Sequence, residues 1–470
     1  MPVIQFSGLA SGIDSKALID AVIEARQTKN QLKQDEIDFL NTENDALEEL
    51  NTKFLALSDL VDQFRTSNGG GVAKKASSTA STVATASASG AASNGSYALT
   101  VTSIADTATG SYTHSYASLS DVVSAGSGTV TVTVGTGADQ VLITGTVTGG
   151  VTTVQQLVDS LNQDSDAAGR AVVAAVNVGT SAVPDYRITV TSQVEGTDKG
   201  TLDLTADAAI TELEAGTPAN INISQATDAV FAIGGVGGVG TTITRQTNTI
   251  DDVITGLTFN LVSGGGATAT ITVGSDPDST ADKMQQIVDQ FNDIVSYINE
   301  NNSVTRVQGE NSVSNVFGTL AKTRIDDDFV SQFKSTLASA SSASGSTVTS
   351  MAAMGISTNR DGTLSFDAEE FKTKVAQDPT GATEVLNSFA DSTSGTGGII
   401  YQYTKFQGFI DIGLDANNSE IENLNKSMEQ LNRYTDKLRA NMEEQFSRLE
   451  ATIGELQNKQ QALSGILASL

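Results

Sequence analysis

Apolar residues near the N-terminus recur at steps of three and four, the spacing of an amphipathic helix. No proline or glycine occurs between residues 14 and 65, so one long helix is predicted there. Asn44 stands where an apolar residue is due; it is either a tolerated polar position or one that sets the register of a helix pair. The predicted coiled-coil seam of this helix comprises Leu40, Leu47, Leu50, Phe54, Leu57, Val61 and Phe64.

The residues from 415 onward carry the clearest heptad pattern of the sequence, and a second long helix is predicted there. Two successive four-residue steps between Leu438 and Phe446 form a stutter, which relaxes a supercoil. Each terminal helix would span roughly 75 to 80 Å at about 1.5 Å per residue, a length that favours a leg over a globule. The predicted C-terminal seam comprises Leu424, Met428, Leu431, Leu438, Met442, Phe446, Leu449, Ile453, Leu456, Leu463 and Leu467.

Between these helices the pattern changes to short alternating runs that are rich in β-branched residues and bounded by glycine, as in half-buried strands. Residues 67–92 are mostly Gly, Ser, Thr and Ala, and they predict a connector or a set of weak edge strands. Runs at 129–134 and 141–147, followed by a helix capped by Thr152 or Thr153 and by two further runs, predict a β-β-α-β-β unit.

Helix signals return at Asp276 and Pro277, a cap residue followed by a proline in the first turn. Further on, residues 359–362 (Asn-Arg-Asp-Gly) lie between two short alternating runs and predict a hairpin turn. Asp367, with Glu370 three residues later, predicts the start of another helix.

The predicted fold class is therefore α+β and multidomain. Long terminal α-helices form a coiled-coil leg, joined by a helical leg domain and by inserted β-rich head domains. The predicted segments are 1–66 (N-terminal leg helix), 67–110 (connector and first strands of the head), 111–224 (inserted β-rich head domain), 225–275 (second β-rich head block), 276–414 (helical leg domain with the hairpin) and 415–470 (C-terminal leg helix).

Composition narrows the class of function. The 470 residues carry a formal net charge of −28, with no cysteine and a single histidine. Such an acidic chain repels nucleic acids and anionic membranes, and no apolar stretch is long enough to span a bilayer. Because thiolates are absent and imidazoles nearly so, we expect no enzyme, no cofactor and no metal. The N-terminus lacks the pattern of a cleaved signal peptide, so any export is expected to use another route.

Two glycine-containing segments resemble ligand loops. Gly235, Gly237 and Gly240 match G-x-G-x-x-G, but β-branched residues follow where a phosphate-binding helix would have to begin. A turn between strands is the better interpretation. Asn359 and Asp361 suggest a calcium loop, yet the first Asp and the final Glu of such a loop are missing, which again favours a turn.

Two polar features also lack a chemical role. The triplet Asp326, Asp327 and Asp328 opens a predicted helix, where carboxylates complement the helix dipole without a metal. His114 lies between two tyrosines in a polar stretch, and no Ser/His/Asp set can be assembled around it, so it is predicted to be an exposed loop residue.

Four segments carry a family likeness that spans nearly the whole chain. They are FSGLASGIDSKALIDAVIEAR (6–26), ANINISQATDAVFAIGG with ITRQTNTIDDVITGLTFNL (219–261), MGISTNRDGTLSFDAEEF (354–371) and EQFSRLEATIGELQNKQQALSGIL (444–467). In this order they closely resemble segments of flagellar filament capping proteins, the flagellar hook-associated protein 2 family. The region 129–204 resembles insertion modules of flagellins and caps.

The resemblance implies a secreted structural protein that forms a homo-oligomeric ring at the tip of a bacterial flagellum. Its legs would reach into the filament while flagellin folds beneath the head domains and is inserted. Further implied partners are hook-filament junction proteins, the type III export apparatus and a cytosolic chaperone that binds the C-terminal helix.

Two other classes stay open at this stage. Another flagellar axial protein, flagellin-like or from the hook-filament junction, would share the terminal coiled coils, although residues 354–371 match the cap type. A surface adhesin built from β modules is the second; tandem repeats and a conventional signal would favour it, and the sequence has neither.

Overall fold

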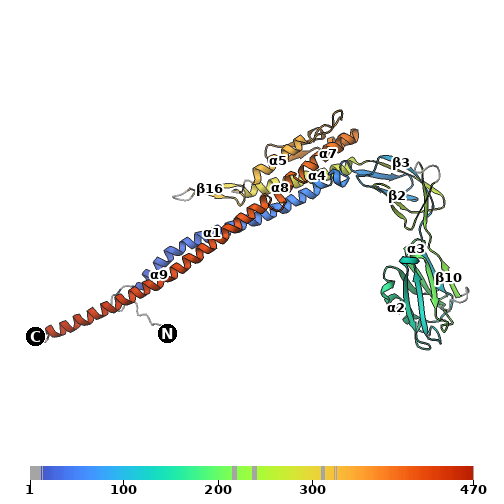
Figure 1. Ribbon diagram of the computed structural model, residues 1–470, viewed down its shortest axis with the longest axis horizontal. Coiled ribbons are helices and arrows are strands. Elements are labelled where there is room, and N and C mark those ends of the chain that lie inside the picture. The colour runs from blue at the N-terminus through green and yellow to red at the C-terminus, as the bar shows by residue number, and fades with distance from the viewer. Residues whose placement is uncertain are drawn as a thin grey trace. The chain divides into compact units, whose positions relative to one another are not determined.

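The computed structural model describes residues 12, 14–213, 220–234, 241–308, 313–321, 323 and 325–468 (Figure 1). The chain divides into two compact units. A helical unit comprises residues 1–71 and 278–470, and a β-rich unit comprises residues 72–277. The terminal helices and the residues after the β-rich insertion therefore belong to one unit.

The helical unit is built around two long helices that come from opposite ends of the chain. α1 covers Ser15–Asp62, and α9 covers Phe409–Ala468. The remaining helices and two small hairpins pack beside one end of this pair (Figure 1). They are α4 (Pro277–Asn301), β16 (Val304–Gln308), β17 (Val313–Phe317), α5 (Ile325–Ser339), β18 (Ile356–Thr358), β19 (Leu364–Phe366), α6 (Ala368–Gln377), α7 (Pro379–Thr393) and α8 (Ile399–Thr404).

Side-chain caps fix where several helices begin. The carboxylate of Asp14 accepts a hydrogen bond from the Ala17 amide at 2.9 Å and starts α1. Asp367 accepts from the amides of Glu369 and Glu370 and starts α6, as predicted. Asp378 caps α7, whose first residue is Pro379. The helix starts predicted at Asp276 and Asp367 and the hairpin around residues 359–362 are confirmed.

Aromatic side chains from α1, α4, α5, α7 and α8 form the core of the helical unit, with Phe389 of α7 5.6 Å from Phe333 of α5. Phe54 of α1 lies 4.2 Å from Phe329 of α5, measured between ring centroids, and 5.5 Å from Tyr403 of α8. Phe291 of α4 stacks on Phe333 of α5 at 4.3 Å. Because these rings are fully or almost fully buried, this cluster holds α1 against the shorter helices.

The β-rich unit contains two modules with separate hydrophobic cores. The first module has one antiparallel sheet of order β1-β15-β3-β11-β12 and a second of order β13-β14-β2. Its edge strands β1 and β2 arise from the Gly/Ser/Thr/Ala-rich region, as predicted. The strands are β1 (Lys74–Ser78), β2 (Ala84–Ala88), β3 (Gly95–Ser103), β11 (Ala229–Gly234), β12 (Thr242–Arg245), β13 (Thr249–Ile254), β14 (Leu257–Leu261) and β15 (Ala267–Ser275).

The second module has a sheet of order β10-β4-β8-β7 and another of order β6-β5-β9. Helix α2 (Val154–Gln163) begins in a capping box between Thr153 and Gln156 and buries its apolar face, as predicted. The other elements are β4 (Thr107–Tyr112), β5 (Gly128–Val134), β6 (Val141–Val147), β7 (Ala171–Asn177), β8 (Tyr186–Glu195), α3 (Thr197–Gly200), β9 (Leu202–Ala206) and β10 (Ile221–Ser224).

The second module is inserted between β3 and β11, which are neighbouring strands of the first module's sheet. The two connecting segments pair with each other. The Asp106 amide donates to the Thr227 carbonyl at 2.9 Å, and the Thr227 amide donates back at 3.2 Å. We call residues 104–107 and 225–228 the neck, because both chain crossings between the modules pass through them.

Candidate assembly surface on the terminal helices

The two terminal helices run antiparallel, and polar contacts at several levels fix their register. The Asn30 amide donates to the Asn432 side chain at 2.6 Å, and Lys33 donates to Ser427. Near the start of α1, the Arg439 side chain donates to Asp20 at 2.8 Å. α1 and α9 thus contact each other over most of the length of α1 (Figure 1).

Asn44 takes part in this pairing. Its amide donates to the Asn418 side chain at 3.1 Å, and its carbonyl oxygen accepts from the Asn417 amide at 2.9 Å. The same Asn417 amide also donates to Glu43, at 3.0 Å. A polar side chain that bonds across a helix pair in one alignment alone favours that alignment, so the geometry supports the register-setting interpretation of Asn44.

The two predicted seams differ in burial. Every residue of the N-terminal seam is buried, from Leu40 to Phe64. The C-terminal seam residues Leu424, Met428, Leu431, Leu438, Met442, Phe446 and Ile453 are half-buried. Leu449, Leu456 and Leu463 are 44 %, 60 % and 60 % exposed, and the Leu467 side chain lies outside the described residues.

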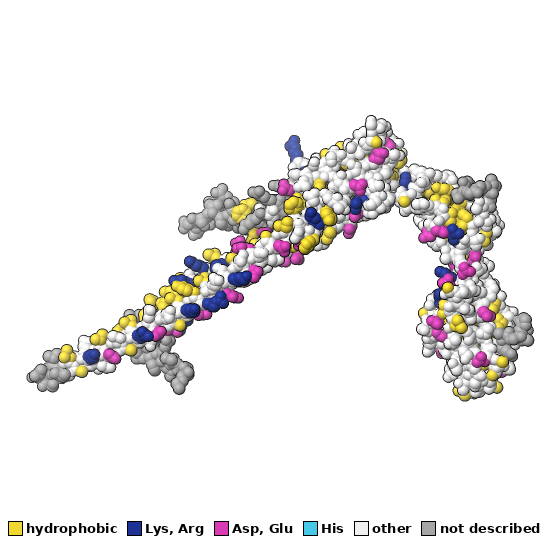
Figure 2. Space-filling model, in the orientation of Figure 1, with side chains coloured by type: hydrophobic (Ala, Val, Ile, Leu, Met, Phe, Trp, Pro, Cys, Tyr) yellow, Lys and Arg dark blue, Asp and Glu magenta, His cyan; other side chains and the backbone are white. Residues whose placement is uncertain are grey.

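The exposed part of the C-terminal seam coincides with the part of α9 that continues beyond α1. α1 begins at Ser15, and the Asp20–Arg439 contact lies close to that end. We call residues 446–468 of α9 the distal segment. Figure 2 shows hydrophobic side chains at the surface of α9 where it runs past α1.

Ion pairs join α1 to neighbouring helices at two places. Hydrogen bonds from Lys16 and then from Arg439 hold the pKa of Asp20 below its ordinary value of 3.8. Near the aromatic core, the hydrogen bond to Asp293 raises the pKa of Lys53, whose ammonium group also lies over the Tyr297 ring. These ion pairs link α1 to α9 and to α4, respectively.

An exposed apolar patch where α8 meets α9 was missed at the sequence level. Tyr401, Phe406, Phe409 and Ile412 are all exposed, and Phe406 is 84 % exposed. Gln407, in the same connection, has a φ of 56°, a left-handed conformation that is uncommon outside glycine. The sequence signal was the run Lys-Phe-Gln-Gly-Phe at 405–409, which carries two aromatic residues between helices.

The other candidate segments take the structural roles predicted for them where they are described. Asp361 accepts from the Thr363 amide and hydroxyl at 3.1 and 2.7 Å, so its carboxylate completes the hairpin turn. His114 is exposed in a loop, with its ring 4.7 Å from that of Tyr116. Asp328 is exposed in the first turn of α5, whereas the side chains of Asp326 and Asp327 lie outside the described residues, as do Gly235, Gly237 and Gly240.

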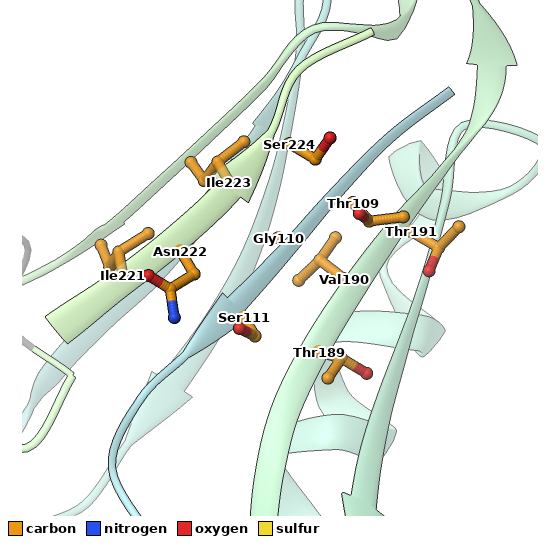
Figure 3. Close-up of a pocket in the computed structure, with 10 residues that line it drawn as sticks. All are labelled: Thr109, Gly110, Ser111, Thr189, Val190, Thr191, Ile221, Asn222, Ile223 and Ser224. Atoms are coloured by element: carbon orange, nitrogen blue, oxygen red, sulfur yellow. The ribbon is translucent and has the colours of Figure 1, made fainter. Parts of the chain in front are cut away.

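A shallow hollow on the β10-β4-β8 face of the second module is lined by uncharged residues (Figure 3). Thr109 and Ser111 of β4 stand opposite Thr191 and Thr189 of β8 in the strand register. No ionisable side chain lines this hollow, so it offers no acid, base or metal ligand. Within the described residues, no group of three or more His, Cys, Asp or Glu is placed to hold a metal, and no helix is long and apolar enough to cross a membrane.

Comparisons with known proteins identify the family. The model of the flagellar hook-associated protein 2 N-terminus matches residues 11–108, and the model of the flagellar hook-associated protein 2 C-terminus matches residues 226–458. The A-type flagellar hook-associated protein 2 of Pseudomonas aeruginosa is 27 % identical and covers 99 % of this chain and 97 % of its own length. The B-type protein of that species is also 27 % identical, over 86 % of this chain and 85 % of its own.

One solved structure supports the fold. The D1-D2-D3 domains of the flagellar cap protein FliD from Escherichia coli superpose with a TM-score of 0.56 at 21 % identity. The match covers 81 % of this chain and 99 % of that one. The helical unit and the β-rich modules thus share an architecture with that protein.

Proposed function

The chain belongs to the flagellar hook-associated protein 2 family, and we propose that it is a structural capping protein at the distal tip of a bacterial flagellar filament. In this role several copies form the cap, promote the folding and insertion of flagellin, and prevent the loss of flagellin monomers. The protein is an extracellular part of the flagellum and serves motility through assembly, without catalysis.

The observation that carries this proposal is the pairing of the two terminal helices. Both family models match segments that contribute to the terminal helices, and these helices form one antiparallel pair with a seam that ends exposed at the distal segment. An elongated pair with an uncovered apolar stripe suits a leg that packs among other helices.

The same proposal includes specific partner proteins. Flagellin and hook-filament junction proteins are the neighbours expected at the tip. Export through the type III apparatus, with a chaperone on the C-terminal helix, accounts for how such a protein reaches that place. Of the alternatives, a different axial protein is disfavoured because the matched relatives are hook-associated protein 2, and adhesion would be an additional property of the β modules.

The decisive experiment introduces charge into the paired part of the seam. Replacing both Leu431 and Leu438 by Asp puts carboxylates into a half-buried apolar stripe, where burial without a partner is costly. In cells that lack the native copy, we expect export of the variant and of flagellin to continue while flagellin escapes as free subunits and no filaments grow. Electron microscopy of cells and immunoblots of the medium measure the two outcomes.

The matched control places the same two substitutions at Gln430 and Lys437, which are exposed and have the same seven-residue spacing. Asn432 is unsuitable as a control because it accepts a hydrogen bond from Asn30 across the helix pair. The control should build filaments of normal length. Normal filaments from the Leu431/Leu438 variant would show that the helix pair does not anchor the cap.

A further inference from the structure

The distal segment has the internal pattern of a self-complementary coiled coil. With Phe446 at heptad position a, Ile453 and Gln460 also fall at a, while Leu449, Leu456 and Leu463 fall at d. The three leucines are the seam residues with the largest exposed fractions described above. This stripe therefore presents a regular row of knobs and holes to a partner helix.

The charge of the distal segment also differs from that of the whole chain. Residues 446–468 contain Arg448 and Lys459 together with Glu450 and Glu455, so this segment is neutral, whereas the chain carries −28. Two copies of so acidic a protein repel each other over most of their surfaces. At the distal segment this repulsion is absent, and close approach of two copies carries no net electrostatic penalty there.

Gln460 adds information about the partner. A polar side chain at an a position disfavours a purely apolar partner, because its amide groups would lose hydrogen bonds on burial. The same residue of an identical helix, aligned in parallel, satisfies it by amide-to-amide bonding. In this alignment Lys459 at position g faces Ser464 at position e of the next heptad, so no like charges meet.

Helix formation imposes little additional cost. The distal segment continues the helix that α1 already stabilises, so the unfavourable nucleation step is complete before any partner arrives. A segment of about three heptads in isolation would be only marginally helical. On the end of α9 it is ready to pair.

We propose that the distal segment of α9 pairs in parallel and in register with the same segment of a second copy of this chain. The choice of a second copy as the partner rests on the proposed cap function, in which several copies gather at one tip. The pairing specifies where those copies touch at the leg end, and it makes the exposed stripe a contact between subunits.

Disulfide trapping in the full chain tests this pairing, since the native sequence has no cysteine. In a parallel, in-register pair, residues at position a face their own counterparts, so the Gln460→Cys variant should form covalent dimers under mild oxidation. Asn458→Cys places the thiol at position f on the opposite face and is the matched control. We expect at least tenfold more dimer from Gln460→Cys, measured on non-reducing gels over a concentration series.

A second pair of variants separates apolar contact from chance collision. Adding Leu456→Asp and Leu463→Asp to Gln460→Cys should abolish the dimer, whereas Ala451→Asp and Asn458→Asp, on the outer face, should leave it unchanged. Because Leu456 and Leu463 are already largely exposed, the helix content of each protein should not change, and circular dichroism checks this.

Equal dimer yields from Gln460→Cys and Asn458→Cys would overturn the proposal. So would a mixture of Gln460→Cys and Leu456→Cys proteins that forms more mixed dimer than either variant forms alone, because position a faces position d of the partner helix only in an antiparallel pair. Failure of trapping with the Leu431/Leu438 phenotype intact removes this pairing alone. If trapping succeeds but the Leu431/Leu438 variant still builds normal filaments, the pairing of the distal segments stands and the helix pair is not the anchor of the cap.

Discussion

The paired part of the terminal helices and the distal segment share a heptad pattern, but their apolar side chains differ in burial. Leu47, Leu50 and Leu57 are fully buried, whereas Leu449, Leu456 and Leu463 stand in solvent. The difference arises because α1 begins at Ser15 and the aromatic core covers its other end. A heptad pattern therefore states which face of a helix requires cover, and the remainder of the fold decides whether the cover comes from the same chain.

The largest expected difference between the two regions is in stability. Leu50→Ala removes a fully buried side chain beside the aromatic core and should lower the free energy of unfolding by about 2–5 kcal/mol. Leu456→Ala should change it by less than about 0.5 kcal/mol, because that side chain is largely exposed within one chain. Denaturant unfolding at low protein concentration measures both values. Equal losses would mean that the distal segment is already covered in the monomer.

A smaller effect tests how the paired region is aligned. Asn44→Ala removes two hydrogen bonds to α9 and should cost about 1 kcal/mol, as judged by denaturant unfolding. Asn41→Ala, at a neighbouring exposed position, is the control and should be near neutral. No loss at Asn44 would favour the tolerated polar position over the register-setting role.

The sequence predicted the long helices, the starts of the shorter helices α2, α4 and α6, and several strands because those features depend on local spacing. It did not predict α7 or α8, since residues 379–404 contain scattered glycines and a short apolar run without a sustained period. Strands β4, β7 and β10 were also missed. β7 is an alanine- and valine-rich run without clear alternation, and β4 and β10 are short strands defined by their neighbours in the sheet.

The candidate assembly surface could be predicted only in part from the sequence, for a similar reason. The seam residues follow from periodicity, but their burial depends on where α1 begins and on the aromatic cluster, which joins residues far apart in sequence. The exposed patch around Phe406 depends on the left-handed turn at Gln407, and no sequence period signals such a turn. Tertiary contacts decided these outcomes.

A weaker effect concerns acid. The depressed pKa of Asp20 means that its ion pairs stabilise the folded state at pH values above 3.8, and that this stabilisation is lost as the pH falls through the lower folded-state pKa. Asp20→Asn should therefore lower the thermal stability slightly at neutral pH and have no effect in strong acid. Melting curves of both proteins at the two pH values give the difference. A constant difference at all pH values would assign the effect to packing.

The smallest expected effect is no change. The proposed role requires neither metal nor nucleotide, so the melting temperature should not respond to EDTA or to added nucleotide. Differential scanning fluorimetry provides the measurement. A shift of several degrees with nucleotide would revive the interpretation of Gly235, Gly237 and Gly240 as a phosphate loop.

The neck gives the second β module an unusual freedom to diverge. Its two crossings, paired through Asp106 and Thr227, enter between adjacent strands of one sheet, so the host sheet keeps its hydrogen-bonding ladder whatever occupies the space between them. A tight two-residue turn would close β3 onto β11 just as well. The second module can therefore change in sequence or size while β3 and β11 stay paired in the sheet of the first module.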